Sequence, residues 1–314
     1  MGITFTGGMT FGGGMAFTAP GGGGGGGGTQ RAIFGYGTGG GNQSLTNLVS
    51  STGVVATNTT GVGTARYGLA AAGYGGDKAI FGYGYGTNYT AVTNLVSNTG
   101  VVATDTTGVG TARFYLAAAG YGTDKAIFGY GNTGSLTAIT NLVSNTGVVA
   151  TDTTGVGTAR QLLAAAGYGT DKAIFGYGTG GGNQSLTNLV SNTGVVATNT
   201  AGVGTARYGL AAAGYGGDKA IFGYGFGSSA YQSITNLVSN TGVVATDTTG
   251  VGTARNNLAA AGYGGDKAIF GYGDTGSVTA ITNLVSNTGV VATDTAGVGT
   301  ARSVLAAAGY STTA

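Results

Sequence analysis

The ionisable residues of this chain recur at fixed positions of a repeated pattern, and histidine, the most frequent catalytic base, is not among them. The 314 residues include no His, Cys or Glu, and only 7% are charged. General acid–base catalysis needs a base or paired carboxylates at one site, and imidazole and thiolate are the usual ligands of zinc. We therefore expect a protein that is not an enzyme and that has no cofactor and no metal site.

Three weaker chemical signals belong to the same pattern. Glycine strings such as Gly35-Tyr36-Gly37-Thr38-Gly39 imitate phosphate-binding loops, but no Gly-Lys-Ser/Thr follows them. An Asp between threonines, replaced by Asn58 and Asn199 in two copies, lacks the ligand count for calcium. Six arginines follow Thr-Ala, namely Arg66, Arg113, Arg160, Arg207, Arg255 and Arg302. Net charge is +2 and these charges repeat, so we expect them to bond neighbouring loop carbonyls or Asp, not nucleic acid. An anion site at the arginines is the alternative.

A repeat of 47 residues organises the chain. The motif Ala-Ile-Phe-Gly-Tyr-Gly starts at Ala32, Ala79, Ala126, Ala173, Ala220 and Ala268, with one step of 48. The 70 glycines are typical of low-complexity disorder. Regular Ile, Phe, Val, Leu and Tyr positions in every copy nevertheless supply a core. We therefore predict a folded repeat domain over residues 29–314.

Each repeat predicts four short strands. In the second copy, Leu69–Tyr74 and Lys78–Tyr83 flank a Gly-Gly-Asp turn, and a variable loop follows. A third strand near Thr93–Ser97 and a fourth at Val101–Thr106 flank Asn98-Thr99-Gly100, which is a hairpin turn signal. Four strands in about 47 residues is the spacing of a propeller blade.

The two ends of the repeat region indicate how a ring closes. The first copy begins at its second strand, near Arg31, and the chain finishes with a surplus first strand, Leu305–Tyr310. That strand can complete the first blade and leave no open edge between the ends. We therefore predict an all-β fold: a six-bladed β-propeller of four-stranded antiparallel blades, closed by the C-terminal strand.

The order of these elements resembles the kelch family of propellers. Kelch blades place an Arg before the innermost strand, then an apolar second strand ending in glycines, a loop, a third strand, a turn and a fourth strand. Arg113, Ala117–Tyr121, Ala126–Gly131, Thr140–Ser144 and Val148–Thr153 follow that order. The chain departs from the family in having Gly-Tyr-Gly for the paired glycines and no Trp on the outer strand. The resemblance covers residues 31–310 and implies a propeller that binds a partner.

The first 28 residues differ from the repeats. Residues 1–20 hold three six-residue units with recurring apolar side chains. These are Ile3, Phe5, Met9, Phe11, Met15 and Phe17. Residues at i and i+2 share one face of an extended strand, so each unit presents an apolar pair that it cannot bury alone. We expect an extended β-type assembly anchor that docks on another chain or on copies of itself. Residues 21–28 are glycines and predict a flexible tether. Neither a signal peptide nor a membrane span is predicted.

The Ile-Thr-Phe-Thr-Gly-Gly opening, the tether and the near-identical copies also resemble virion proteins of tailed marine phages. This resemblance implies a bacteriophage virion structural protein, such as a tail fibre or tail tip, that is made in the host cytoplasm. Residues 1–20 would then join other virion proteins. We expect an adhesin for host recognition that binds a host-surface glycan or protein. The alternatives are a purely structural virion decoration or assembly protein, and a cellular kelch-like adaptor or lectin.

Differences among the six copies locate the binding face. The copies differ mainly after Gly-Tyr-Gly and in the two residues after Thr-Ala-Arg, and an antiparallel blade places both segments at one end of its strands. The candidate ligand-binding residues are Asn42, Gln43, Tyr67, Tyr85, Asn88, Tyr89, Phe114, Tyr115, Asn183, Gln184, Tyr208, Phe226, Tyr231, Asn256 and Asn257. Rings offer apolar area and amides offer paired hydrogen bonds, which suits sugars or protein surfaces. The alternative is that these loops drift because they carry no packing load.

Overall fold

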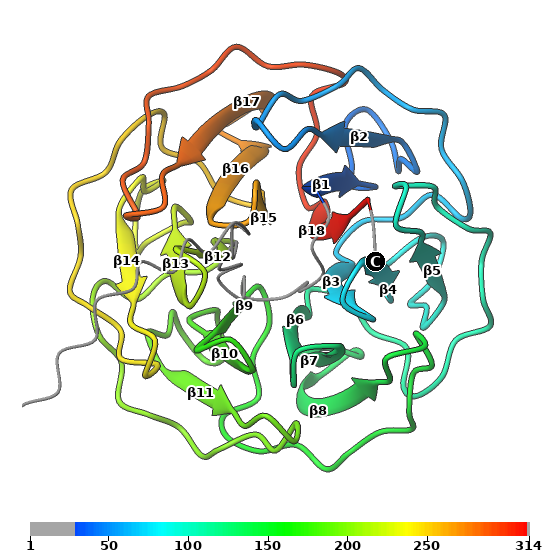
Figure 1. Ribbon diagram of the computed structural model, residues 1–314. Coiled ribbons are helices and arrows are strands. Elements are labelled where there is room, and N and C mark those ends of the chain that lie inside the picture. Colours follow the sequence, from blue (N-terminus) through cyan, green and yellow to red (C-terminus); the bar gives the residue numbers. More distant parts are fainter. Residues whose placement is uncertain (1–28, 313–314) are drawn as a thin grey trace, which may run out of the picture.

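The Ala-Ile-Phe-Gly segment of each repeat forms the middle strand of a three-stranded antiparallel sheet. The computed structural model describes residues 29–312, in which six such sheets stand around a central axis (Figure 1). Every regular element in that range is a strand, and no helix there is long and apolar enough to cross a membrane. The fold is therefore all-β and propeller-like. The anchor and the tether predicted for residues 1–28 lie outside the described part of the chain.

Each sheet has an inner, a middle and a third strand. The inner strands are β3 (Ala70–Tyr74), β6 (Ala117–Tyr121), β9 (Ala164–Tyr168), β12 (Ala211–Tyr215), β15 (Ala259–Tyr263) and β18 (Ala306–Ser311). The middle strands are β1 (Gln30–Gly35), β4 (Lys78–Gly82), β7 (Lys125–Asn132), β10 (Lys172–Gly176), β13 (Lys219–Gly223) and β16 (Lys267–Asp274). The third strands are β2 (Thr46–Val49), β5 (Thr93–Val96), β8 (Leu136–Val143), β11 (Thr187–Val190), β14 (Thr235–Val238) and β17 (Val278–Val285). We call each sheet, with the segment after its third strand, a blade, and number the blades 1 to 6 from the N-terminus.

The last strand of the chain completes the first blade, as predicted. Strand β18 pairs with β1 in an antiparallel register that runs from Gln30 opposite Ser311 to Gly35 opposite Ala306. The two strands come from opposite ends of the repeat region and lie side by side in Figure 1. Strand β18 also lies between the inner strands β15 and β3 of its two neighbouring blades.

The prediction of a fourth strand at Val101–Thr106 and its counterparts is wrong, because the sheets have three strands. In blade 2 this outer segment is bridged to β5 at two points only, Val102 and Thr106. Four residue steps separate these points on the outer segment and three separate their partners on β5, so a regular ladder does not form. The Nδ2 of Asn94 donates to the carbonyl of Ala103 at 3.0 Å and takes the place of a backbone donor. The same two bridges and the same Asn bond recur in the other blades.

Neighbouring blades bury one apolar cluster at each interface, which we call a seam. At the seam of blades 2 and 3, Ile80 and Tyr83 pack with Phe128 and Val143, and all four side chains are fully buried. The small residues of the inner Ala-Ala-Ala strands join the same clusters. Removal of this apolar surface from water is the main source of stability for the ring.

A glycine in the middle strand makes this packing possible. A Cβ on Gly129 would lie 2.8 Å from Cζ of Phe175 in the next blade. Phe175 is fully buried, so it has little room to move. The equivalent glycine meets the equivalent Phe at 2.6–2.8 Å in all six seams. A side chain at this position would therefore overfill the seam.

We expect Gly129→Ala to destabilise the domain by about 1–3 kcal/mol, the usual cost of overpacking a filled core. Urea unfolding followed by circular dichroism measures the change. Gly86→Ala is the matched control, because its Cβ would meet nothing closer than 3.4 Å, and we expect a change below about 0.5 kcal/mol. Equal losses in the two variants would contradict the packing explanation.

Candidate functional site

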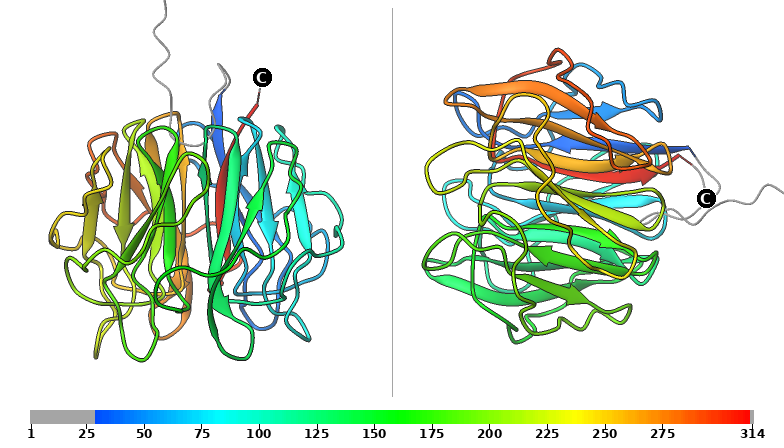
Figure 2. Two further views of the ribbon diagram at one scale, coloured as in Figure 1. Left: turned by 90° about the horizontal axis from the view of Figure 1, so that it is seen from below. Right: turned by 90° about the vertical axis from the view of Figure 1, so that its left-hand side faces the viewer.

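The two variable segments of each repeat meet at one end of the strands. The residue after Thr-Ala-Arg is bridged to the first residue after Gly-Tyr-Gly, as Tyr67 is to Tyr85. We call this end, made of residues 38–45, residues 67–68 and their counterparts, the loop face. The Gly-Asp-Lys and Asn-Thr-Gly turns form the turn face at the other end of the strands (Figure 2). The described chain begins on the turn face, where the Thr312 amide donates to the Thr29 carbonyl at 3.2 Å.

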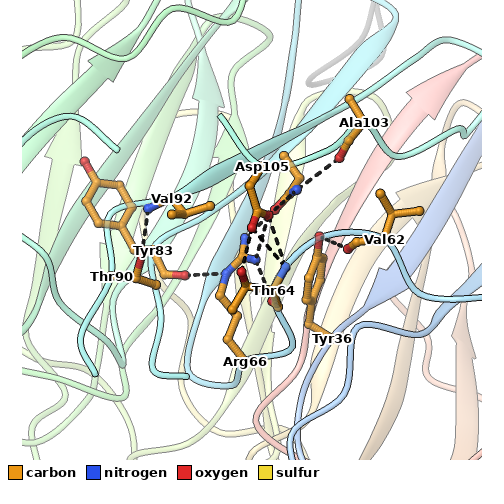
Figure 3. A network of polar contacts seen from close by, with 10 residues as sticks. Tyr36, Val62, Thr64, Arg66, Tyr83, Thr90, Val92, Ala103 and Asp105 are labelled. Carbon is orange, nitrogen blue, oxygen red and sulfur yellow. Dashed lines mark hydrogen bonds and ion pairs between the residues drawn. The ribbon is translucent and has the colours of Figure 1, made fainter. Parts of the chain in front are cut away.

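A buried arginine holds each pair of variable segments in place. Arg66 directly precedes Tyr67 and has no exposed surface. Its Nε donates to the Tyr83 carbonyl at 2.8 Å, its Nη2 to Oδ1 of Asn94 at 2.7 Å, and its Nη1 to the Thr64 carbonyl at 3.0 Å (Figure 3). The link that leaves blade 1 is thereby fixed to the residue that follows β4 and to strand β5 of blade 2. All six arginines make the same three bonds, which confirms that they bond neighbouring carbonyls.

A tyrosine of the preceding blade covers the guanidinium. The ring centroid of Tyr36 lies 4.4 Å from Cζ of Arg66, and the ring meets Phe81 edge-on with centroids 5.1 Å apart. A desolvated cation over a ring face is attracted by the ring quadrupole. The Tyr36 hydroxyl donates to the Val62 carbonyl at 3.1 Å. Burial raises the pKa of Tyr36 to about 12, although the charge of Arg66 opposes the shift. These contacts also hold Tyr36 at a φ of 63°, which is uncommon for a bulky residue.

The aspartates of the Ala-Thr-Asp-Thr motif complete four of the six seams. Asp105 accepts hydrogen bonds from the amide and hydroxyl of Thr64 at 2.6–3.2 Å and lies 3.9 Å from Arg66. Burial raises the pKa of Asp105, but its hydrogen bonds and the Arg66 charge outweigh burial and lower the pKa overall. In the other two seams Asn58 and Asn199 keep the contact with the threonine without the negative charge.

The second residue after each Thr-Ala-Arg joins a ring around the central axis. These residues are Gly68, Tyr115, Leu162, Gly209, Asn257 and Val304. Each backbone N–H donates to the carbonyl of the equivalent residue in the preceding blade at 2.6–3.0 Å, and the six bonds close a circle. All six residues have left-handed φ angles of 51–64°. The ring surrounds a pocket of about 70 Å³ that is also lined by the six leucines that follow it. Two predicted binding residues, Tyr115 and Asn257, therefore belong to this axial ring.

Five aromatic rings gather over blades 2 and 3, and we call them aromatic cluster 1. They are Tyr67, Tyr85, Tyr89, Phe114 and Tyr115. Ring centroids are 5.6 Å apart for Tyr67 and Tyr85, 5.4 Å for Tyr85 and Tyr89, and 5.3 Å for Tyr89 and Phe114. Tyr89 is 38% exposed and follows the exposed Asn88, while the other four rings are half-buried. The structure thus brings these predicted residues together as one aromatic surface.

A smaller group of three rings lies over blade 5, and we call it aromatic cluster 2. Tyr208 and Phe226 have centroids 5.7 Å apart, and Phe226 and Tyr231 meet edge-on at 5.1 Å. The Tyr231 hydroxyl lies 3.4 Å from Oδ1 of Asp274. Burial and then the Asp274 charge raise the pKa of Tyr231. This cluster has a carboxylate at its edge, which cluster 1 lacks.

The predicted amide side chains are only partly available to a ligand. Asn42 and Asn183 each donate from Nδ2 to a loop carbonyl of the next blade, at 3.2 and 2.9 Å. Gln43 and Gln184 donate to carbonyls of their own loops. Asn256 is only 8% exposed. The main role of Asn42, Asn183, Gln43 and Gln184 is therefore to hydrogen-bond the loops themselves. Asn256 is too buried to contact a large ligand directly.

Two exposed apolar residues on the loop face lie outside both aromatic clusters, and the sequence analysis did not predict their exposure. Leu136 is 36% exposed and Val278 is 38% exposed. They begin the third strands of blades 3 and 6, where β7 and β8, and likewise β16 and β17, continue into tight hairpins. The Asn-Thr-Gly and Asp-Thr-Gly sequences before these residues could have predicted the hairpins, because such residues favour tight turns.

The described chain offers no preformed metal centre: residues 29–312 contain no group of three or more His, Cys, Asp or Glu side chains. Comparison with protein-family models and with curated proteins gives no match. The candidate site therefore rests on the geometry of the loop face.

Asp105, Asp152, Asp247 and Asp294 all have pKa values lowered by the seam contacts. A lowered folded-state pKa stabilises the fold above the unfolded value of 3.8, and this contribution is lost as the pH falls through the folded values. Changing all four residues to Asn copies the two natural Asn seams. We expect that variant to show a flatter decline of the urea midpoint between about pH 5 and 2.

The urea midpoint of the variant should still depend slightly on pH, because the Lys172 contact also lowers the pKa of Asp171. Asp124→Asn is the control, since this carboxylate lies outside the seam networks and pairs with Lys125 on the turn face. An unchanged acid response in the fourfold variant would show that the seams do not govern acid stability.

Proposed function

We propose that this chain is a non-enzymatic appendage of a tailed-phage virion, of the tail-fibre or tail-tip kind, that binds a host-surface glycan or protein. The observation that carries the proposal is the position of the two aromatic clusters. They lie on the loop face, at the opposite end of the domain from Thr29, where the described chain begins.

This polarity fits an appendage. Residue 28 is bonded to Thr29 at the turn face, so an anchor in residues 1–20 would connect to the domain at the end opposite the loop face. Binding and assembly then use opposite ends of the domain and do not compete for surface.

The domain is well suited to carry such a site. We infer a six-bladed propeller, spanning residues 29–314, in which the irregular outer segment takes the place of a fourth strand. The arginine contacts repeat at every seam, so the loops stand on a rigid base. Binding sites are commonly built from loops that a rigid scaffold positions.

A purely structural virion protein is the second candidate, and one observation favours it. The valine after each Asn-Thr-Gly or Ser-Thr-Gly turn is 65–66% exposed in all six blades. These residues are Val54, Val101, Val148, Val195, Val243 and Val290. A repeated set of exposed valines beside the turn face would suit packing on a symmetric assembly.

A binding assay separates these two functions. Labelled full-length chain is applied to an array of bacterial surface glycans and to intact marine bacteria. We expect binding by the native chain and at least a tenfold loss when Tyr85, Tyr89, Phe226 and Tyr231 are all changed to Ser. Loss of several ring contacts of roughly 0.5–1.5 kcal/mol each is the reason.

The control carries Val54→Ser and Val101→Ser, which alter exposed apolar residues of the turn face. It should bind as the native chain does. Thermal unfolding of each variant shows whether the fold is retained. Binding that survives in the folded fourfold variant, or that is lost in the valine control, would refute the loop-face site, and no binding at all would favour the structural candidate.

A further inference from the structure

The loops repeat with a longer period than the framework. Residues 179–186 have the same sequence as residues 38–45, three blades earlier, and Tyr208-Gly209 repeats Tyr67-Gly68. The two seams with Asn in place of Asp are also three blades apart, at Asn58 and Asn199. The extended hairpins occur in blades 3 and 6 only. The domain therefore consists of two similar halves, blades 1–3 and blades 4–6, related by half a turn about the central axis.

The two aromatic clusters occupy equivalent places in these halves. Tyr67 is bridged to Tyr85 and Tyr85 to Tyr89 in the first half. Tyr208 is bridged to Phe226 and Phe226 to Tyr231 in the second half. The centroid distances are 5.6 and 5.4 Å in the first set and 5.7 and 5.1 Å in the second. Each half thus presents the same triad of rings.

An insertion shows that the triad is retained while its surroundings change. The loop at residues 226–234 is one residue longer than its counterpart at residues 85–92, and apart from the shared glycine after the first ring the residues between the two rings differ. The Gly86 amide nevertheless donates to the Asn88 carbonyl, and the Gly227 amide donates to the Ala230 carbonyl. Each loop therefore closes in a turn that brings its second aromatic ring beside the first. Free drift of the loops gives no reason for the second ring to survive an insertion beside it.

The flanks of the two triads differ. Phe114 and Tyr115 extend the first triad, with their ring centroids 4.0 Å apart. Asn256 and Asn257 stand at the same positions in the second half, and Asn256 is bridged to Asp274. With these two additional rings, cluster 1 offers more aromatic ring surface than cluster 2.

The charge of the loop face restricts the ligand class. Asp274 is the one charged residue in the variable segments of the six repeats. An anionic partner would find no complementary charge in these segments and a cationic partner only Asp274. The weakly polar faces and edges of sugar rings, in contrast, match aromatic side chains with polar tips.

We propose that the chain carries two sites for a neutral glycan, one on each aromatic triad, and that the site of cluster 1 binds more tightly. This inference rests on the proposed function, since both sites belong to the loop face, and it adds their number, their ligand class and their order of affinity.

Calorimetric titration of the full-length chain tests the proposal, with the neutral hexasaccharides maltohexaose, cellohexaose and mannohexaose as probes. We expect at least one probe to bind in two unequal steps. Tyr89→Ser should weaken the tighter step about tenfold and Tyr231→Ser the weaker step about tenfold. The combined change Phe114→Asn and Tyr115→Asn should bring the two steps closer together. Leu136→Ser with Val278→Ser, exposed on the same face outside both clusters, should change neither.

The outcomes separate this inference from the function on which it rests. A single step abolished by Tyr89→Ser alone would overturn the second site and leave the proposed function intact. Loss of both steps in the Leu136 and Val278 control would place the sites elsewhere on the face. If no hexasaccharide binds while intact bacteria still do, the glycan assignment fails and a protein ligand replaces it. If neither binds, both proposals fail.

Discussion

The buried arginine at each seam is the interaction on which the ring depends. A guanidinium without exposed surface loses its hydration, and such a group is tolerated when its donors are paired. Arg66 meets this requirement with three bonds and a tyrosine ring, and its partners belong to two consecutive blades. Removing it would leave three acceptors without that donor, each at a cost of about 1–3 kcal/mol. Because Arg66 is adjacent to Tyr67, the contact that couples the blades also positions the first residue of the loop face.

Local sequence patterns were enough to predict the three strands of each blade. The predicted fourth strand is wrong because a side chain takes the place of a backbone donor there. The apolar runs and the glycine turns of blade 2 place β3, β4 and β5 within one residue of their predicted ends. The segment Val101–Thr106 has the same β-rich composition, so nothing in its own residues marks it as irregular. The cause lies on the neighbouring strand, where the amide of Asn94 bonds both Ala103 and Asp105. A pattern read along one segment does not contain that information.

The candidate site was predictable as a face but not as a set of contacts. Variable residues after Gly-Tyr-Gly and Thr-Ala-Arg do lie together, because antiparallel strands bring both segments to one end. The axial ring explains part of the variation in another way: it is made by backbone N–H and C=O groups, so Gly, Tyr, Leu, Asn and Val all serve. Variation at Tyr115 or Asn257 is therefore no evidence of binding by itself. The retained rings at Tyr89 and Tyr231 carry more weight, since no axial bond accounts for them.

Two symmetries coexist in this domain, and their difference is informative. Each blade must fit equivalent neighbours, so the buried arginine, the tyrosine that covers it and the glycine that faces each buried phenylalanine repeat at all six seams. The contacts between loops of neighbouring blades, such as the bond from Asn42 to Gly86 and its counterpart from Asn183 to Gly227, follow a twofold pattern instead. The two proposed sites lie on opposite sides of one axis, so they would allow a single chain to engage two copies of a ligand on a repetitive surface. Once one site is occupied, binding at the second site is intramolecular. The overall affinity then exceeds that of either site alone, without any new contact. Aromatic surfaces that bind a single sugar weakly would gain most from this arrangement.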